Sequence, residues 1–222
     1  MTYTISDIHG EYEKFLKMLE LIDFKSSDKL YILGDVMDRG ILPIKTMLYI
    51  MKHSNMEFLL GNHEEFFLEY HKNGCIDNDG WLRCGGMTTF EEIMTYGQEI
   101  ETMILSFLKK AQLIKRLSIN GNIFFLSHAG LEFNEKTGEL LNTQYRDFML
   151  WAREEFLHQN LSNVPDGTYV IFGHTPTFTI DKKPKEQATI WKQNHKIGID
   201  CGAVFGGRMA CLRLEDMEEF YV

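Results

Sequence analysis

Five short apolar runs are each followed at once by acidic, amide or imidazole side chains, and this repeated pattern most constrains the fold. The clearest case is residues 30–33, an apolar run that ends at Gly34 and is followed by Asp35, Asp38 and Arg39. An apolar run of this length indicates a buried strand. The glycine lets the backbone turn tightly and approach a ligand closely. The sequence therefore predicts two carboxylates and a guanidinium on a loop that a rigid strand positions, which is a candidate site for a metal and a phosphate.

Four other apolar runs end in the same way. In chain order, the runs and the polar residues behind them are 2–6 with Asp7 and His9, 56–60 with Asn62 and His63, 123–126 with His128, and 169–172 with His174. Apolar residues at helical spacing separate the first three runs, so the sequence predicts right-handed βαβ units and a parallel core. Residues past the carboxyl ends of parallel strands face one crevice, and these side chains are therefore predicted to converge.

The remaining elements are predicted from periodicity and turn residues. Helices are expected over residues 12–22, 44–51 and 101–111, and Pro43 lies near the first turn of the second, where a missing N–H costs nothing. The favoured turn dipeptide Asn120-Gly121 predicts a hairpin over residues 117–126. One helix is expected over residues 145–157, and strands over residues 188–191, 196–199 and 209–214.

Residues 66–116 interrupt the alternation of strands and helices. Residues 72–86 are rich in Gly, Asn and Asp and are predicted to be loop-like, and helical spacing follows further along. We interpret 66–116 as a mostly helical insertion that borders the site. The sequence shows no repeat, low-complexity tract or linker, so residues 1–222 are expected to form a single domain around one sizeable core.

The composition argues against several classes of protein. A net charge of −9 disfavours a general binder of nucleic acid or acidic membranes. The first residues lack the basic and apolar segments of a signal peptide, and no apolar run approaches the roughly eighteen residues of a membrane span. The four cysteines, Cys75, Cys84, Cys201 and Cys211, have no close-paired spacing, and a core of this size needs no disulfide. The sequence therefore predicts a cytoplasmic protein with reduced thiols and leaves its oligomeric state open.

The converging side chains have the composition of a metal site. Two carboxylates, three imidazoles and one amide oxygen suit borderline divalent ions, with manganese expected first and iron or zinc as alternatives. They are too many for one tetrahedral ion and sufficient for two ions that share a carboxylate. Such a pair, about 3.5–4 Å apart, would clamp the attacking and leaving oxygens of an in-line displacement. A bridging water would lose its proton near neutral pH, because one zinc ion lowers the pKa of bound water to about 7.

A histidine beside a strand is more often a structural residue than a ligand. The four histidines of the repeated pattern are exceptions because each lies at the same place, just past a buried strand. The others, His53, His71, His158 and His195, are in polar or helical contexts and are assigned no role.

Several segments of the chain together resemble the calcineurin-like metallophosphoesterases. They are Asp7-Ile8-His9-Gly10, Gly34-Asp35-Val36-Met37-Asp38-Arg39-Gly40, Gly61-Asn62-His63-Glu64, Ser127-His128-Ala129-Gly130 and Gly173-His174-Thr175-Pro176. The Asp-Arg-Gly ending of the second segment is similar to the phosphoprotein phosphatase branch. Leu150-Trp151-Ala152-Arg153 and the glycine-rich residues 198–207 are similar to its bacterial and phage members. The resemblance implies an α/β, four-layer fold in which two packed mixed β-sheets are flanked by α-helices.

The resemblance also implies a set of six metal ligands. Asp7 and His9 would hold one metal, Asp35 would bridge two metals, and Asn62, His128 and His174 would complete the second. Thr175-Pro176 follows His174 where many phosphodiesterase relatives carry a further metal-binding histidine. This departure fits the phosphoprotein phosphatase branch and disfavours a nuclease.

Four further residues receive catalytic roles by the same resemblance. His63, oriented by Asp38, would be the general acid that protonates the leaving oxygen. Arg39 and Arg153 would bind the phosphate oxygens.

The leading hypothesis is a metal-dependent phosphomonoester hydrolase, a serine/threonine protein phosphatase in which a hydroxide bridging the two metals attacks directly. Its substrate would be a phosphorylated protein or a small phosphate ester. The alternative is a symmetrical bis(5'-nucleosyl)-tetraphosphatase that acts on dinucleoside polyphosphates. Trp81 or Tyr145 would then offer a stacking surface for a base, although core packing is the favoured interpretation of both. A third hypothesis, a catalytically silent binding scaffold, is disfavoured because none of the expected ligands is missing.

Overall fold

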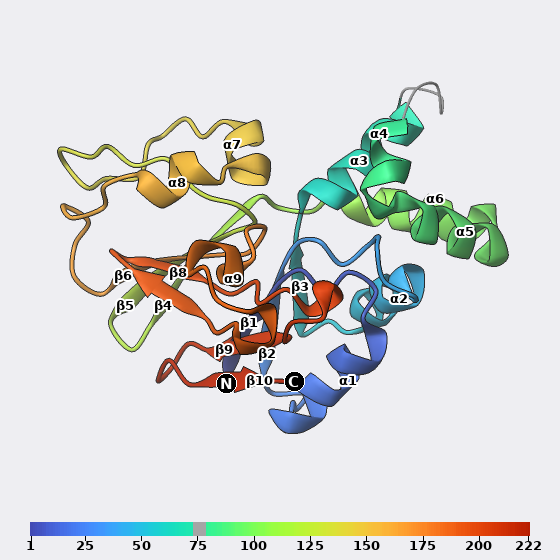
Figure 1. Ribbon diagram of the computed structural model, residues 1–222, viewed down its shortest axis with the longest axis horizontal. Coiled ribbons are helices and arrows are strands. Elements are labelled where there is room, and N and C mark those ends of the chain that lie inside the picture. The colour runs from blue at the N-terminus through green and yellow to red at the C-terminus, as the bar shows by residue number, and fades with distance from the viewer. Residues whose placement is uncertain (73–78) are drawn as a thin grey trace.

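Two five-stranded sheets form the centre of the molecule (Figure 1). The computed structural model describes residues 1–72 and 79–222. The first sheet has the spatial order β10–β9–β1–β2–β3, with β1 (Thr2–Ile5), β2 (Lys29–Leu33), β3 (Met56–Leu59), β9 (Ala210–Arg213) and β10 (Glu219–Tyr221). The second has the order β4–β5–β6–β8–β7, with β4 (Ile114–Ile119), β5 (Asn122–Ser127), β6 (Thr168–Phe172), β7 (Trp191–Gln193) and β8 (Lys196–Gly198).

Each sheet has a parallel core with antiparallel strands at its edges. In the first sheet β1, β2 and β3 are parallel, and Ile32 pairs with Ile5 on one side and Phe58 on the other. Strand β9 runs antiparallel to β1, and β10 antiparallel to β9. In the second sheet β5, β6 and β8 are parallel, while β4 and β7 are antiparallel to their neighbours. The predicted parallel units, the hairpin at Asn120-Gly121 and the mixed character of both sheets are confirmed.

The apolar run at residues 30–33 is explained by burial on both faces of the first sheet. Leu30 and Ile32 pack in the cluster that joins this sheet to its covering helices. Tyr31 and Leu33 point the other way, into the cluster between the two sheets. Because successive side chains of a strand alternate between faces, a strand covered on both sides must be apolar at every position.

The second sheet repeats this arrangement. Leu126 and Ile171 face the first sheet, and Val170 and Phe172 face the helices on the outer side. Figure 1 shows helices outside both sheets. The order helices, sheet, sheet, helices is the expected four-layer metallophosphoesterase fold, which is therefore confirmed.

Nine α-helices and three helical segments of other kinds lie in the described part of the chain. The α-helices are α1 (Tyr12–Leu21), α2 (Pro43–Lys52), α3 (Asn62–Lys72), α4 (Asp79–Trp81), α5 (Met87–Tyr96), α6 (Gln98–Leu108), α7 (Arg146–Trp151), α8 (Glu154–His158) and α9 (Thr177–Ile180). The others are a π-helical turn, η1 (Leu82–Gly86), and two 3₁₀ turns, η2 (Lys185–Gln187) and η3 (Ala203–Phe205). Pro43 is the first residue of α2, as predicted.

The single helix predicted over residues 145–157 is wrong, because the chain forms α7 and α8 with a break between them. Ala152 has an extended backbone and Arg153 has φ −127° and ψ −95°, which are not helical values. The apolar spacing that predicted one helix persists across the break, since Met149 and Phe156 both reach the outer core. The break frees Arg153 to turn toward the strand ends.

The loop predicted over residues 72–86 is also wrong in part. Residues 79–86 form α4 and η1, and they end at Gly86, where a side chain would meet the ring of Trp81 at 2.4 Å. Glycine there lets the helical turn pack directly on a fully buried tryptophan. The rest of that prediction, residues 73–78, lies outside the described residues.

The carboxyl-terminal predictions are partly confirmed. The strands predicted over residues 196–199 and 209–214 correspond to β8 and β9, but the strand predicted over 188–191 begins only at Trp191, after η2. Strand β10 was not predicted. Cys84, Cys201 and Cys211 are free thiols, and Cys75 lies outside the described residues. None of the helices within residues 1–72 and 79–222 combines the length and the apolar character that a membrane span needs.

The contact between the two sheets leads to a stability prediction. Leu212 of β9 is fully buried in the cluster that joins them. We expect Leu212→Ala to lower the free energy of unfolding by about 2–5 kcal/mol, because it removes buried apolar atoms and leaves a cavity. The matched control is Leu21→Ala on the exposed side of α1, which should change stability by no more than about 0.5 kcal/mol. Urea denaturation measures both, and equal effects would contradict the sheet-to-sheet core.

Candidate active site

The chain turns abruptly after three of the five site-bearing strands, β1, β2 and β6. Six candidate site residues have the left-handed backbone that side chains other than glycine rarely adopt: Asp7 (φ 50°), His9 (45°), Asp35 (53°), Asp38 (69°), Arg39 (65°) and His174 (63°). Each such residue costs on the order of 1–2 kcal/mol relative to ordinary backbone. Strain of this kind is stored where the surrounding structure determines it, and such positions cluster at functional sites.

Two glycines let the strand ends approach each other. A side chain at Gly61 would lie 2.3 Å from Oδ1 of Asp35, and one at Gly173 would lie 2.1 Å from Oδ2 of Asp7. Neither position has room for a Cβ atom. The glycines that precede Asn62 and His174 are therefore required for the carboxylates to reach the centre.

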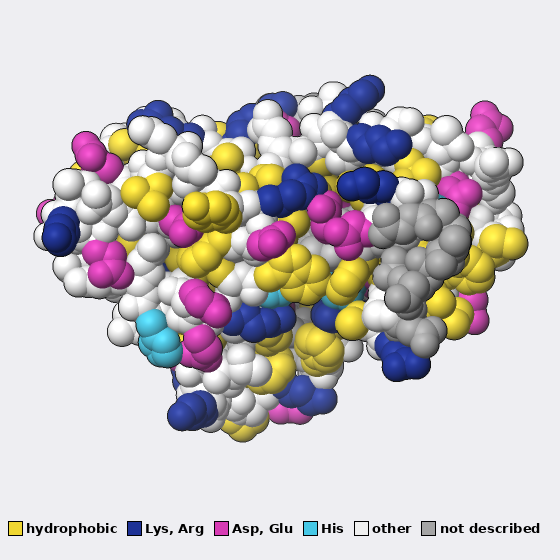
Figure 2. Space-filling model, turned by 90° about the horizontal axis from the view of Figure 1, so that it is seen from above, with side chains coloured by type: hydrophobic (Ala, Val, Ile, Leu, Met, Phe, Trp, Pro, Cys, Tyr) yellow, Lys and Arg dark blue, Asp and Glu magenta, His cyan; other side chains and the backbone are white. Residues whose placement is uncertain are grey.

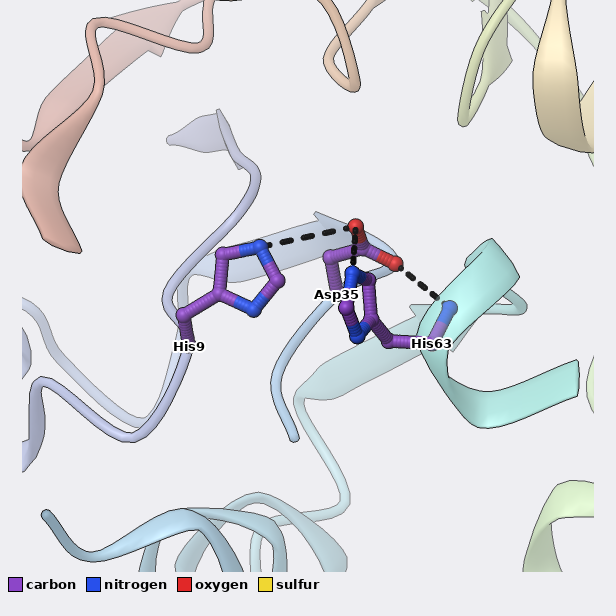
Figure 3. A group of neighbouring side chains, drawn as sticks. All are labelled: His9, Asp35 and His63. Carbon is purple, nitrogen blue, oxygen red and sulfur yellow. Dashed lines mark hydrogen bonds and ion pairs between the residues drawn. The ribbon is translucent and has the colours of Figure 1, made fainter. Parts of the chain in front are cut away.

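The Asp35 carboxylate lies at the centre of the site (Figure 3). Its Oδ2 is 3.5 Å from Nε2 of His9 and 4.0 Å from Nε2 of His63. Its Oδ1 accepts a hydrogen bond from the backbone N–H of His63 at 3.1 Å and lies 3.4 Å from Nε2 of His128. Asp35 thus contacts residues from the ends of β1, β3 and β5.

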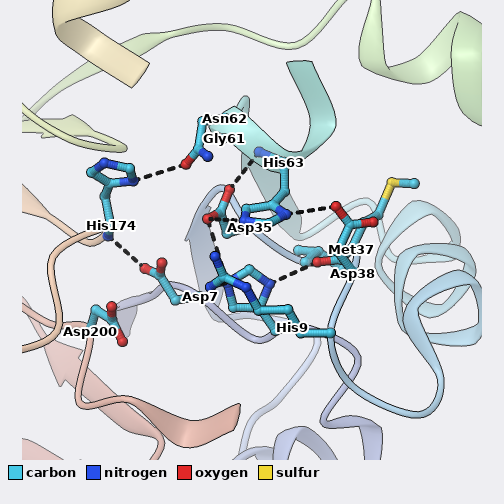
Figure 4. A network of polar contacts seen from close by, with 12 residues as sticks. Asp7, His9, Asp35, Met37, Asp38, Gly61, Asn62, His63, His174 and Asp200 are labelled. Atoms are coloured by element: carbon cyan, nitrogen blue, oxygen red, sulfur yellow. Dashed lines mark hydrogen bonds and ion pairs between the residues drawn. The ribbon is translucent and has the colours of Figure 1, made fainter. Parts of the chain in front are cut away.

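A second group of ligand atoms surrounds Asn62. Its Oδ1 is 2.8 Å from Nε2 of His128 and 2.9 Å from Nδ1 of His174. The backbone N–H of His174 donates to Oδ2 of Asp7 at 2.9 Å, and Figure 4 shows Asp7, Asn62 and His174 around one space. The structure therefore brings all six predicted metal ligands together.

Two clusters of potential ligand atoms share Asp35. One comprises His9, Asp35 and His63, and the other Asp35, His128 and His174, with the ligand atoms of each within 4.8 Å of one another. A carboxylate common to two clusters is the arrangement that a pair of metal ions requires. The first cluster also includes His63, to which the sequence assigned a catalytic role and not a ligand role.

The imidazoles are prepared to accept a cation. Nδ1 of His9 is 2.8 Å from the carbonyl oxygen of Met37, and Nδ1 of His128 is 2.7 Å from that of Leu33. A carbonyl can only accept, so Nδ1 carries a proton in both rings. In the neutral ring the lone pair is then on Nε2, which lies beside Arg39 Nη1 in His9 and beside Oδ1 of Asn62 in His128. Burial is the main cause that lowers the pKa of both histidines and favours the neutral ring.

The carboxylates are buried without enough positive charge. Burial, followed by the neighbouring charges of Asp7 and Glu64, raises the pKa of Asp35 well above its ordinary value. Nε2 of His174 is buried and has no hydrogen-bond partner among residues 1–72 and 79–222. Buried carboxylates, neutral imidazoles and an unpartnered ring nitrogen fit a divalent metal, which would favour the charged form of Asp35. Backbone carbonyls on the far ring nitrogens are the usual supports of metal-binding histidines.

His63 and Asp38 form a buried pair beside the first cluster. Nδ1 of His63 lies 2.6 Å from Oδ2 of Asp38. Trp81 Nε1 donates to the same oxygen at 2.8 Å, and the Thr89 hydroxyl donates to Oδ1 at 2.6 Å. Burial raises the pKa of Asp38 to about 7, and the bonds from Thr89 and Trp81 oppose that rise. The structure places Asp38 against His63, and two further donors stabilise its carboxylate.

Both arginines reach the site. Arg39 Nη1 is 2.7 Å from Nε2 of His9, and Arg39 Nε donates to the carbonyl oxygen of Cys84 at 3.3 Å. Arg153 Nη1 donates to the carbonyl oxygen of His174 at 2.8 Å and lies 3.2 Å from Oγ1 of Thr175. In Figure 2, Lys and Arg side chains and small areas of histidine meet near the middle of the face. An acidic molecule thus presents positive charge at the site, which attracts an anionic substrate.

Two buried acids of the site received no role from the sequence. Glu64 accepts hydrogen bonds from the backbone N–H groups of Asp35, Val36, Met37 and Gly61, at 2.9, 2.9, 3.0 and 3.1 Å. Asp200 lies beside Asp7 in Figure 4, and burial together with the charge of Asp7 raises its pKa well above normal. The available signal was their position inside the segments that carried the family resemblance.

Trp81 and Thr89 gave no comparable signal. Trp81 was expected to pack in the core; it is fully buried, but it also binds Asp38. The same expectation is wrong for Tyr145, which is 66% exposed. Thr89 lies more than fifty residues along the chain from Asp38, and no spacing rule connects them.

The sequence profile of the calcineurin-like phosphoesterase family matches residues 2–199. Since this match covers most of the chain, the protein belongs to that family, in its phosphoprotein phosphatase branch, and is a phosphoester hydrolase. Membership and the two clusters that share Asp35 together indicate a dinuclear metal site.

Individual relatives include two kinds of enzyme. The chain is 25% identical to a symmetrical bis(5'-nucleosyl)-tetraphosphatase of Methylobacillus flagellatus, over 100% of this chain and 94% of that protein. It is 28% identical to serine/threonine-protein phosphatase 2 of Escherichia coli, over 96% of this chain and 92% of that protein. A solved structure described as a putative diadenosine tetraphosphatase has a TM-score of 0.69 and 20% identity, covering 100% of this chain and 92% of that one, which shows the shared fold.

The central position of Asp35 leads to a prediction about metal content. We expect Asp35→Asn to bind less than half as much Mn²⁺ per chain as the unaltered protein, because it removes the charge common to both clusters. Metal per chain is measured by mass spectrometry after equilibration and gel filtration.

A matched control exists in Asp23→Asn. Asp23 also has a left-handed backbone, with φ 48°, but its side chain is 82% exposed. Its substitution should leave metal content unchanged. A chelator should lower the melting temperature of the control but not of Asp35→Asn, since a ligand stabilises only the form that binds it. Full metal loading of Asp35→Asn would contradict the shared-carboxylate arrangement.

Proposed function

We propose that the protein is a metal-dependent phosphomonoester hydrolase that acts on phosphoserine and phosphothreonine in proteins. The observation that carries the proposal is the buried His63–Asp38 pair, which lies directly beside the two clusters that share Asp35. A proton donor next to a metal site suits a reaction whose leaving oxygen is a poor leaving group.

Six residues would hold a pair of metal ions: Asp7, His9, Asp35, Asn62, His128 and His174. We propose manganese for both ions, with iron or zinc as alternatives. When bound, the ions would neutralise phosphate charge and lower the pKa of a water. The guanidinium groups of Arg39 and Arg153 would bind the phosphate oxygens and hold the ester in line. Burial of the site excludes bulk water and strengthens these interactions.

His63 would protonate the leaving oxygen. The carboxylate of Asp38 accepts a hydrogen bond from Nδ1–H of His63. In the imidazolium form the other N–H is therefore at Nε2. The donors from Trp81 and Thr89 favour the ionised form of Asp38. An ionised Asp38 in turn favours the charged ring, which burial alone disfavours.

The general-acid role of His63 leads to a prediction about substrates. We expect His63→Asn to lower kcat by about 10²–10⁴-fold on an alkyl phosphate, the usual share of a positioned acid. The loss should be smaller on p-nitrophenyl phosphate, because nitrophenolate leaves without a proton. Steady-state kinetics on both esters measure the difference.

The control for this substitution is His53→Asn at the end of α2, where His53 binds the carbonyl oxygen of Tyr49. It should retain the activity of the unaltered protein on both esters. Equal losses of His63→Asn on the two esters would remove the acid assignment but leave the hydrolase.

A length comparison supports the protein phosphatase over the second candidate. The alignment with the E. coli phosphatase extends over 220 residues, close to the 222 of this chain. The alignment with the M. flagellatus tetraphosphatase extends over 268 residues, so that relative carries segments that this chain lacks. A site for a dinucleoside tetraphosphate must hold two nucleosides, and the shorter chain has less material to build it.

The second candidate is a symmetrical bis(5'-nucleosyl)-tetraphosphatase. The alignment with the M. flagellatus enzyme, which covers 100% of this chain and 94% of that protein at 25% identity, favours it. So does the aromatic side chain of Trp151, which is 40% exposed and whose ring centroid lies 6.1 Å from that of His174. Tyr145, one residue before α7, is more exposed still. Exposed rings of this kind can stack on a base.

Product analysis distinguishes the two candidates. The purified protein with Mn²⁺ is given a phosphoserine peptide or diadenosine tetraphosphate at equal concentration, and phosphate or adenosine diphosphate is measured. A larger kcat/KM for the peptide is the expected result. A larger kcat/KM for the dinucleotide would replace the leading proposal with the second one, and Asp35→Asn serves as the inactive control for both.

We also propose that residues 66–116 form part of the wall of the site within a single domain of residues 1–222. The contacts of Trp81 and Thr89 with Asp38 support this. So does the backbone N–H of Arg39, which donates to the carbonyl oxygen of Gly85 at 2.9 Å.

A further inference from the structure

The carboxyl end of α8 is held by a single buried ammonium group. Lys196 of β8 is only 2% exposed, and its Nζ donates to the carbonyl oxygens of Phe156, Leu157 and Gln159 at 2.9, 2.7 and 2.7 Å. The last carbonyls of a helix have no partner within the helix. Lys196 supplies those partners from the neighbouring sheet.

A buried lysine at this position requires an explanation. An ammonium group loses much hydration energy on burial, and burial lowers the pKa of Lys196 to about 8. The charged form still predominates at pH 7, and three carbonyl oxygens satisfy its three N–H donors. An apolar side chain would fill the same volume without the loss of hydration. We therefore interpret Lys196 as a residue that holds α8 in position, in addition to packing within the second sheet.

Helix α8 begins directly after Arg153. The backbone N–H of Leu157 donates to the carbonyl oxygen of Arg153 at 2.9 Å, so one helical turn joins the lysine contacts to the arginine. The Arg153 side chain then donates to the carbonyl oxygen of His174 and to Thr175. A shift of α8 along its axis would carry the guanidinium with it.

Strands β6 and β8 also position His174, the residue that Arg153 contacts. Lys196 lies opposite Val170 in the parallel pair of β6 and β8, and β6 ends at Phe172, two residues before His174. Figure 1 shows α8 on the same side of the molecule as β6 and β8, and the rings of Phe156 and Phe172 are 5.1 Å apart. The positions of Arg153 and His174 therefore both depend on β6 and β8.

We propose that Lys196 is a positioning residue that sets the Arg153 guanidinium at the phosphate-binding side of the site. The inference rests on the proposed role of Arg153 as a phosphate ligand. It assigns the lysine no contact with the substrate. Its effect should therefore be on phosphate affinity more than on the chemical step.

The test compares Lys196→Met with Lys196→Arg in the full-length, manganese-loaded protein. We expect Lys196→Met to raise KM for p-nitrophenyl phosphate and the inhibition constant of inorganic phosphate about tenfold each, with kcat within about threefold, because ground-state and transition-state binding are lost together. Lys196→Arg, which retains a charged donor for the carbonyls, should recover most of both constants. If Lys196→Met does not fold, Lys196→Gln, with a single amide donor group, should give a smaller rise of the same kind.

A destabilised control distinguishes positioning from stability. Leu212→Ala lies in the other sheet and should lower the melting temperature without raising KM. A fall in melting temperature of the lysine variants with unchanged KM and phosphate inhibition would overturn the inference.

Arg153→Ala separates this inference from the proposed function. If Arg153→Ala raises KM and the lysine variants do not, the positioning role fails and the phosphate role of Arg153 stands. If Arg153→Ala leaves KM and phosphate inhibition unchanged, the phosphate role fails and the inference fails with it.

Discussion

The buried carboxylate of Asp35 is the interaction on which the site depends, because it joins the two sheets chemically. It contacts His9 and His63 from the first sheet and His128 from the second. Apolar packing between the sheets brings the strand ends to the same edge, but it does not choose which atoms meet there. That choice is made by the turn after each strand, and Asp35 lies where those turns converge.

The turns around Asp35 are strained, and a second buried acid holds them in place. Asp35 and Asp38 both have left-handed backbone, which an isolated loop would avoid. Glu64 accepts hydrogen bonds from the N–H groups of Asp35, Val36 and Met37. Hydrogen bonds to a charged acceptor are among the stronger ones in a protein. The first turn of α3 therefore stabilises the loop after β2, and the strain is balanced by contacts that only the folded chain can make.

Charge balance explains why such a site suits divalent ions. Burial raises the pKa of Asp35 and of Asp200, and in both cases the charge of Asp7 adds to the effect. An acidic cluster in a low-dielectric setting must take up protons or a cation. The imidazoles are neutral, and their far nitrogens are hydrogen-bonded to backbone carbonyls. Such rings are suited to bind a metal ion in place of a second proton. Arg39 and Arg153 extend this balance to the side from which an anion would enter.

The elements that depend on neighbouring residues could be predicted from the sequence. Apolar runs followed by glycine and polar residues located the five site-bearing strands, Pro43 located the start of α2, and Asn120-Gly121 located the hairpin. These features depend on neighbouring residues, so they could be predicted from spacing. The ten candidate site residues followed from the same runs and from the family resemblance. All six predicted ligands lie at the strand ends that the pattern indicated.

Features that depend on distant parts of the chain became visible only in the folded molecule. The break before Arg153, the donors from Trp81 and Thr89 to Asp38, and the burial of Lys196 beneath α8 are examples. Each involves contacts between segments tens of residues apart. Apolar spacing along the chain does not predict such contacts. The spacing over residues 145–157 is as suitable for one helix as for two. The chain breaks there, and beside the break Arg153 makes two hydrogen bonds, to His174 and Thr175, that apolar spacing does not encode.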